Sequence, residues 1–189
     1  MNQIFAIRKD LPNYQVLDLG LTDITRHLPD SADLDSVFDF SELNTSLASL
    51  WNTPETRYVN SGKKKALQPD LSCWVDSTLV LSPKAYRFLK DSLVNLGEFL
   101  PVEIDGELHY IFNCFVWGDV NEEACEFNNE EGMEAGLKHL EFRSSASNLL
   151  VFKAQIECGL TLFCSQRFKD IVESFELVGL TFDENLIVA

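Results

Sequence analysis

Residues 79–113, LVLSPKAYRFLKDSLVNLGEFLPVEIDGELHYIFN, decide the fold that the sequence predicts. Ser82 is a typical N-cap residue, and the proline that follows it suits the first turn of a helix. Apolar residues then recur at helical spacing, which predicts an amphipathic helix that ends at a cap near Gly97. The flanking apolar runs predict strands, and the Asp-Gly pair at 105–106 predicts a hairpin turn between the last two. The stretch therefore predicts strand, helix, strand, turn, strand.

The C-terminal third repeats part of this pattern. Residues 149–164 predict two strands, Ser165 is placed to cap a second amphipathic helix, and a final strand follows near residue 180. Each unit reads strand, serine, helix, strand, which indicates either an internal duplication or two uses of a common unit. The pattern favours an α+β fold, with a mostly antiparallel sheet and two or three packed amphipathic helices.

The N-terminal segment is less regular. Two short strands before residue 20 and a short helix near residues 41–51 are followed by a polar excursion that contains the lysine run 63–65. We therefore divide the chain into an N-terminal α/β appendage, residues 1–70, packed on a main α+β domain, residues 71–189. This second part contains both helical units.

Composition limits the partners and the location. The net charge of −15 argues against nucleic acid and against an anionic membrane surface, because both ligands require basic residues. The five cysteines include no C-x-x-C pair, which predicts buried, reduced thiols. The first residues lack the apolar stretch of a signal peptide, and no run has the length of a membrane span. These features predict a cytoplasmic protein.

Motifs for chemistry are absent from the sequence. There is no G-x-S-x-G, no phosphate-binding loop and no close His or Cys spacing of a metal site. His109 lies in a predicted strand, where a packed histidine is the usual case. We expect no enzymatic activity, no metal and no cofactor, although 30 acids leave an unrecognised pair of catalytic carboxylates open.

Acidic residues gather in one block, residues 119–136, which holds seven acids and no base. This block suits either a solvated loop or a contact surface for a basic protein, with Phe127 and Met133 as apolar anchors. The polar residues 119–148, which include this block, predict part loop and part helix. The candidate contact residues are Glu122, Glu123, Glu126, Glu130, Glu131 and Glu134, with a second patch at Asp33, Asp35 and Asp39.

Five segments in order, LVLSPKAYRFL, GEFLPVEIDGELHYIFN, VFK, SQRFKD and LVGLTF, resemble immunity protein family eleven of bacterial polymorphic toxin systems. The resemblance spans residues 79–182, and the first 70 residues are similar only to the variable N-terminal part of that family. It implies a protein that neutralises a cognate toxin by binding and has no enzymatic activity. We expect the toxin to act in the cytoplasm and to have a basic contact surface.

The resemblance brings no catalytic or interface residue with it, and the sequence leaves the oligomeric state open. The alternative function is a non-enzymatic intracellular scaffold or regulatory binding protein.

Overall fold

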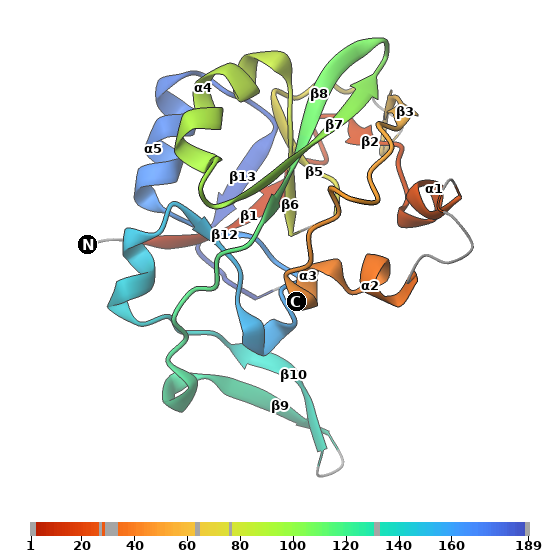
Figure 1. The fold of residues 1–189 in the computed structure, drawn as a ribbon. Helices are drawn as coiled ribbons and strands as arrows, with labels where there is room; N and C mark the ends of the chain where they lie inside the picture. The colour runs from red at the N-terminus through yellow and green to blue at the C-terminus, as the bar shows by residue number, and fades with distance from the viewer. Residues whose placement is uncertain are drawn as a thin grey trace.

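The chain forms a five-stranded sheet, a four-stranded sheet and two separate strand pairs, with helices packed against the sheets (Figure 1). The pairings between the named strands are antiparallel, except for one short parallel pair at a sheet edge. The fold is therefore α+β with mainly antiparallel sheets, as predicted. This computed structural model describes residues 3–26, 28, 34–62, 65–75, 77–130 and 133–187.

The five-stranded sheet contains the predicted hairpin and has the order β3-β7-β8-β6-β5. Asp105 and Gly106 turn the chain between β7 and β8, and both have positive φ angles, 52° and 80°. This is the turn geometry that the Asp-Gly pair predicts. The strands are β3 (Glu55–Thr56), β5 (Leu71–Cys73), β6 (Thr78–Leu81), β7 (Gly97–Ile104) and β8 (Glu107–Cys114).

The predicted first helix is α4 (Pro83–Leu93). The Ser82 hydroxyl accepts a hydrogen bond from the Ala85 N–H at 3.2 Å, so the predicted N-cap is confirmed. The predicted cap at Gly97 is wrong, because the helix ends at Val94 and Gly97 begins β7. A Cβ at Gly97 would lie 2.0 Å from the Asn113 carbonyl oxygen. Close approach of two strands, not helix capping, therefore requires glycine there.

The four-stranded sheet has the order β11-β12-β1-β13, so the N-terminal strand is an inner strand between C-terminal ones. The strands are β1 (Ile4–Lys9), β11 (Val151–Phe152), β12 (Phe163–Ser165) and β13 (Leu180–Asp183). The second helix, α5 (Gln166–Ser174), follows β12 with Ser165 at its N-cap position. The Ser165 hydroxyl makes no capping hydrogen bond, so only the position was predicted correctly.

The two helical units share a topology. In the first, β6 and β7 flank α4 in sequence, and both pair antiparallel with β8. In the second, β12 and β13 flank α5, and both pair antiparallel with β1. In each unit a helix connects two strands, and a third strand lies between these two and pairs antiparallel with both. The likeness between the two units in sequence therefore extends to their topology.

The pairing of β1 also bears on how the chain is divided. The boundary at residue 70 stays a prediction, but residues 4–9 are an inner part of a sheet whose other strands lie between residues 151 and 183. The remaining small elements are the pair β2 (Val16–Leu17) and β4 (Tyr58–Val59), the pair β9 (Glu126–Glu130) and β10 (Met133–His139), and three 3₁₀ helices, η1 (Glu122–Ala124), η2 (Ser144–Asn148) and η3 (Gln155–Glu157).

A central core joins the two sheets to α4 and α5. Phe112 of β8, Phe5 of β1, Leu89 of α4 and Phe168 of α5 all lie in it and are fully buried. The two helices also meet directly, since the rings of Phe88 and Phe175 stack with centroids 4.2 Å apart (Figure 1). Truncating one of these buried side chains to alanine typically costs about 2–5 kcal/mol.

Each sheet has a second buried face, because neighbouring strand residues point to opposite sides. Ile111, next to Phe112, packs in a second core with Trp74, and Phe40 of the N-terminal segment covers this core. Ala6, next to Phe5, packs in a third core with Leu140 and its neighbours. Because both faces of both sheets are apolar, the remaining segments pack over these faces.

The helix expected at residues 41–51 is not present. Instead the structure has α1 (Leu21–Thr25), α2 (Leu34–Phe38) and α3 (Phe40–Leu43). Asn44 adopts a left-handed conformation with φ 53° and ends α3. Leu47 is buried beyond that turn while Leu43 is 59% exposed, so the two leucines do not share one helical face. A local αL residue therefore overrides the leucine spacing.

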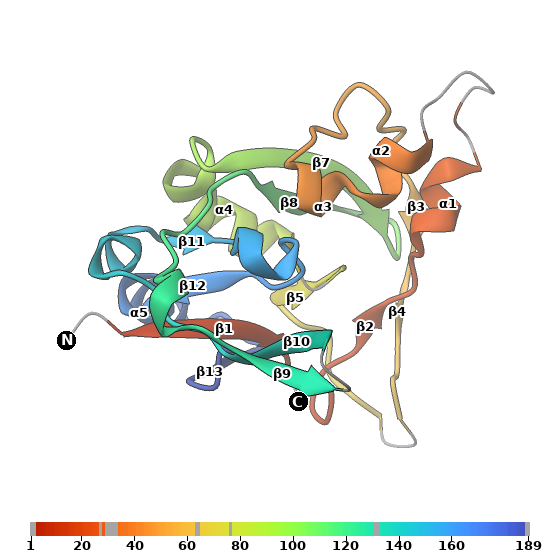
Figure 2. The same ribbon diagram turned by 90° about the horizontal axis from the view of Figure 1, so that it is seen from below.

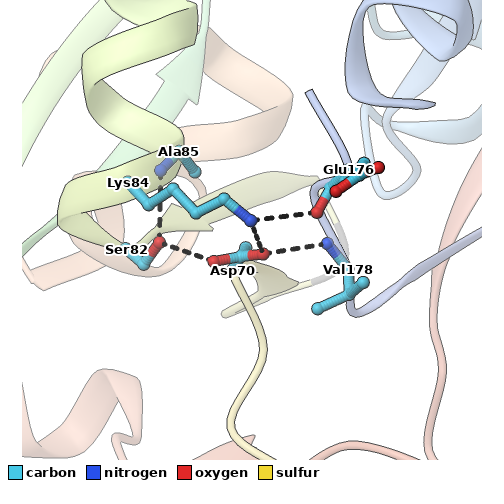
Figure 3. Close-up of polar contacts among 6 residues, drawn as sticks. All are labelled: Asp70, Ser82, Lys84, Ala85, Glu176 and Val178. Atoms are coloured by element: carbon cyan, nitrogen blue, oxygen red, sulfur yellow. Dashed lines mark hydrogen bonds and ion pairs between the residues drawn. The ribbon is translucent and has the colours of Figure 1, made fainter. Parts of the chain in front are cut away.

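A polar junction ties the start of α4 to the loop after α5 (Figure 3). The Asp70 carboxylate accepts hydrogen bonds from Lys84 Nζ at 3.0 Å and from the Val178 N–H at 3.2 Å. Lys84 Nζ also donates to the Glu176 carbonyl oxygen at 3.0 Å. The Asp70 side chain is 18% exposed and that of Lys84 is 44% exposed, so the carboxylate is the shielded member of this network.

We expect Asp70→Ala to lower the free energy of unfolding by about 2 kcal/mol, since it removes two hydrogen bonds to a charged and largely shielded acceptor. Urea denaturation of the variant measures this change. Asp91→Ala is the matched control, because Asp91 is an exposed acid of α4, the helix that carries Lys84. Equal midpoints for the two variants would contradict the role given to the junction.

Candidate functional site

The acidic block begins with a loop and the 3₁₀ helix η1, in line with the part loop and part helix expected over residues 119–148, but it also contributes to a β-hairpin that we did not expect. Its strands, β9 and β10, pair only with each other within the described residues, and the hairpin projects from the body of the molecule (Figures 1 and 2). Phe127 and Leu137 are cross-strand partners, with register shifts on both sides of Leu137. These bulges interrupt the alternation by which a strand is recognised in sequence.

The two chain segments at the base of the hairpin, residues 119–121 and 141–143, are joined to each other by backbone hydrogen bonds. The Asn121 N–H donates to the Glu141 carbonyl oxygen at 2.9 Å, and the Arg143 N–H donates to the Asp119 carbonyl oxygen at 2.8 Å. Val120 and Phe142 form an isolated antiparallel bridge between these two pairs. The hairpin is therefore closed at its base and extends beyond the third core.

Three of the predicted acids lie exposed on this element. Glu122 and Glu123 belong to η1, and Glu126 begins β9. Glu126 forms an ion pair with Lys138 at 2.7 Å, which lowers the pKa of the Glu126 carboxyl and raises that of Lys138. The charge of Glu126 is therefore partly balanced by Lys138.

The structure says less about the other candidate residues. Glu130 lies in β9 and Glu134 in β10, and their side chains are outside what the structure describes. Glu131 and Asp33 lie outside the described residues altogether. Their contact roles stay predictions.

The second predicted patch lies on the short helices of the N-terminal segment. Asp35 of α2 and Asp39, at the N-cap position of α3, are both exposed. Leu34, Phe38 and Leu43 beside them are between 45% and 59% exposed. The patch therefore combines acids with uncovered apolar side chains.

An apolar groove of about 630 Å³ lies between the hairpin and the segment around η3. Phe127 and Leu137 contribute from the hairpin, and Leu160 contributes from the loop after η3. Leu160 is 65% exposed and Phe127 is 37% exposed, so apolar surface is uncovered on two segments that border the groove. The described residues that line it are Phe127, Asn128, Gly136, Leu137, Leu140, Ile156, Glu157, Cys158, Leu160, Thr161, Leu186 and Ile187.

Glu157 is the one acid among the described residues that line this groove. Its Oε1 accepts a hydrogen bond from the Thr161 N–H at 2.7 Å. Burial raises the pKa of the Glu157 carboxyl to about 7, against the opposing effects of Thr161 and Arg8. Arg8 Nη2 donates to the Leu186 carbonyl oxygen at 3.4 Å, so Arg8 links this site to the C-terminal segment.

A buried lysine connects the groove to α3. Lys153 is fully buried, and its Nζ donates to the Ser41 carbonyl oxygen at 2.6 Å and lies 4.8 Å from the centre of the Trp117 ring. The Ser41 hydroxyl in turn donates to the Gly159 carbonyl oxygen at 2.5 Å. Gly159 has φ +64°, and a Cβ there would lie 2.7 Å from the Ser41 carbonyl oxygen. These contacts fix the loop that carries Leu160.

A larger, open hollow of about 1000 Å³ lies beside α1 and β3. Among the described residues that line it, four of the five charged ones form two ion pairs, Arg26 with Asp23 at 2.8 Å and Arg57 with Asp18 at 3.3 Å. Because these charges are satisfied locally and the hollow is polar, the smaller apolar groove is the better candidate for a binding site.

The residues considered as catalytic or metal-binding candidates have structural roles. His109 is buried, with Nδ1 3.0 Å from the Glu107 carbonyl oxygen and its ring against Tyr58, so it is a packed histidine of β8 and not an exposed one. Within the described ranges, no group of three or more His, Cys, Asp or Glu is arranged to hold a metal ion. Ser82 is buried at the α4 N-terminus and serves as the cap.

All five cysteines are free, and three of them, Cys73, Cys114 and Cys164, are buried. Burial raises the pKa of the Cys114 thiol to about 11 and that of Cys164 further. The expectation of buried thiols is wrong for Cys158, which is exposed at the groove.

No protein-family model matches this chain, and no curated protein matches it significantly. The resemblance to immunity protein family eleven therefore rests on the sequence motifs alone. None of the helices in the described part of the chain is long and apolar enough to cross a membrane.

The buried charge of Lys153 gives a pH-dependent prediction. Burial lowers the pKa of Lys153 from 10.5 to about 8, so the folded protein loses this proton at lower pH than the unfolded chain. Between these two values the unfolded state binds more protons, and the lysine penalty on stability is relieved as pH rises. Relative to Lys153→Met, the wild type should therefore gain roughly 1–3 kcal/mol of unfolding free energy from pH 7 to 10.

Urea denaturation of both proteins at several pH values, under reducing conditions, measures this difference. Lys90→Met is the control, because Lys90 is exposed and the variant should follow the wild-type pH profile. Parallel profiles for wild type and Lys153→Met would show that Lys153 carries no burial penalty.

Proposed function

We propose that this protein is an immunity protein that binds and neutralises a cognate bacterial toxin. The observation that carries the proposal is a projecting hairpin with exposed acids beside an uncovered apolar groove. Acids at the edge of an interface speed the encounter with a basic partner, and apolar side chains at its centre retain the partner. The motif resemblance supplies the class of partner.

The proposed site of action is the cytoplasm. All five cysteines are free, as is usual for proteins in a reducing compartment. A basic toxin that acts inside the cell, such as a nuclease or a protein-modifying enzyme, has the charge that this surface would attract. We infer no catalytic step for the protein, and the neutralisation would follow from binding alone.

The direct test is expression of the toxin domain encoded beside this gene, with and without this protein. Growth arrest that is relieved by this protein, together with a stoichiometric complex of the two purified chains, would establish the proposal. A neighbouring gene product that is toxic but neither bound nor neutralised would refute it. Binding without any toxicity would favour a scaffold or regulatory role.

Charge reversal at Glu122 and Glu123 tests the acidic surface. We expect the double variant Glu122→Lys and Glu123→Lys to slow association with the toxin about tenfold at low salt, with a smaller effect on dissociation. Stopped-flow or surface-plasmon measurements at rising salt give both rates.

The matched control is Glu103→Lys with Glu107→Lys, which makes the same charge change on the β7–β8 hairpin. Both control residues are exposed, and their hairpin turn lies at the other end of the molecule from β9 and β10 (Figure 1). Equal slowing by both pairs would mean that net charge, and not this surface, governs the encounter.

A further inference from the structure

We propose that the groove between the β9–β10 hairpin and η3 binds a segment of the partner that presents an apolar side chain next to a lysine or arginine. The apolar side chain would lie against Phe127, Leu137 and Leu160, and the cation would pair with Glu157. This inference rests on the proposed function, because it takes the toxin as the partner and specifies which part of its surface is recognised.

The apolar half of the inference follows from surface that the chain leaves uncovered. Leu160 is 65% exposed, although the Ser41–Gly159 contact fixes the backbone that carries it. Phe127 is 37% exposed on the facing hairpin. A held leucine and a phenylalanine on two sides of one groove form a site for an apolar side chain that needs little rearrangement.

The cationic half follows from where Glu157 lies. It lines an otherwise apolar groove, and the Thr161 N–H occupies one position on Oε1 at 2.7 Å. A carboxylate has about four acceptor positions, so a guanidinium or ammonium group has room to bind. In such a partly buried setting an ion pair gains more than at an open surface.

The surroundings select a cation over an anion. Glu42 of α3 lies beside Cys158 at the groove, and Glu126 lies at the hairpin. Of the nearby bases, Lys138 is paired with Glu126 at 2.7 Å, while Arg8 donates to the Leu186 carbonyl oxygen at 3.4 Å and its charge also acts on Glu157. A second copy of this chain, with net charge −15, would bring more negative charge to the same place. A basic partner is therefore favoured over self-association.

The test uses short synthetic peptides and the full-length protein, so it does not depend on the toxin. One peptide has leucines and arginines at its centre, a second has glutamate in place of each arginine, and a third has serine in place of each leucine. Titration is followed by NMR on the isotopically labelled protein. We expect the first peptide to shift the signals of Phe127, Glu157 and Leu160 and to bind about tenfold more tightly than either control.

Two variants assign the two halves of the site. Leu160→Glu should abolish binding of the leucine–arginine peptide, while Leu67→Glu, at a leucine 67% exposed outside the groove, should not change it. Glu157→Gln keeps an oxygen acceptor for Thr161 but removes the charge. We expect it to weaken binding of this peptide about tenfold and to leave that of the glutamate peptide unchanged.

The pH dependence separates an ion pair from simple packing. The pKa of Glu157 is about 7 before a ligand binds, so binding of the arginine peptide should tighten from pH 6 to 8 in the wild type but not in Glu157→Gln. The charged or titratable neighbours Arg8, Cys158 and Glu42 are present in both proteins, as is His139 of β10. Their contributions therefore cancel in the comparison.

Absence of groove shifts with the leucine–arginine peptide, or equal binding of the glutamate peptide, would overturn the inference. If Leu160→Glu and Glu157→Gln still neutralise the toxin fully, the groove proposal fails while the immunity function stands. If the groove binds the peptide as described but no toxin is neutralised, the proposed function fails and the groove remains a binding site for basic, apolar segments.

Discussion

The central core is the constraint on which the rest of the structure depends. Phe5 of β1 and Phe112 of β8 come from different sheets and from positions far apart in the chain, yet both are buried with residues of α4 and α5. Because adjacent strand residues point to opposite faces, filling this core also commits Ala6 and Ile111 to the other side of each sheet. Those faces are apolar too, so the N-terminal segment and residues near 140–149 must cover them. The β9–β10 hairpin covers neither of these faces.

Buried polar contacts then determine how the covering segments are held. Lys153 is buried, and no carboxylate is among the described residues that are known to contact it. The Ser41 carbonyl oxygen and the Trp117 ring stabilise its charge. Such an arrangement contributes specificity more than stability, because desolvation of the ammonium group offsets much of what the contacts return. Its consequence is local: α3, η3 and the loop bearing Leu160 keep one relative position. This contact therefore determines the shape of the groove.

A feature of the fold could be predicted from the sequence where the residues that determine it are close together in the chain. The segment from β6 to β8 followed from a capping serine, a helical stripe and an Asp-Gly turn, each of which acts within a few residues. The helix cap predicted at Gly97 was wrong. Glycine is required there because the Asn113 backbone of a neighbouring strand lies so close, and sequence spacing does not reveal that contact. The hairpin was missed because polar residues and two register shifts hide its alternation. Phe127 was anticipated as an anchor, whereas Glu157 and Leu160 carry no sequence signal and become a site only when folding brings them beside the hairpin.

The position of the hairpin outside the cores has a physical consequence for binding. An isolated two-stranded sheet is marginally stable in water, so β9 and β10 depend on the contacts at their base, where Asn121 bonds Glu141 and Arg143 bonds Asp119. Substitutions farther out therefore cost little folding free energy, and the acids there are not constrained by packing. The groove differs, because Glu157 and Leu160 lie on a loop fixed to the core through Gly159. A partner would thus meet an adaptable charged element that affects the rate of encounter and a fixed apolar site that determines how long the complex lasts.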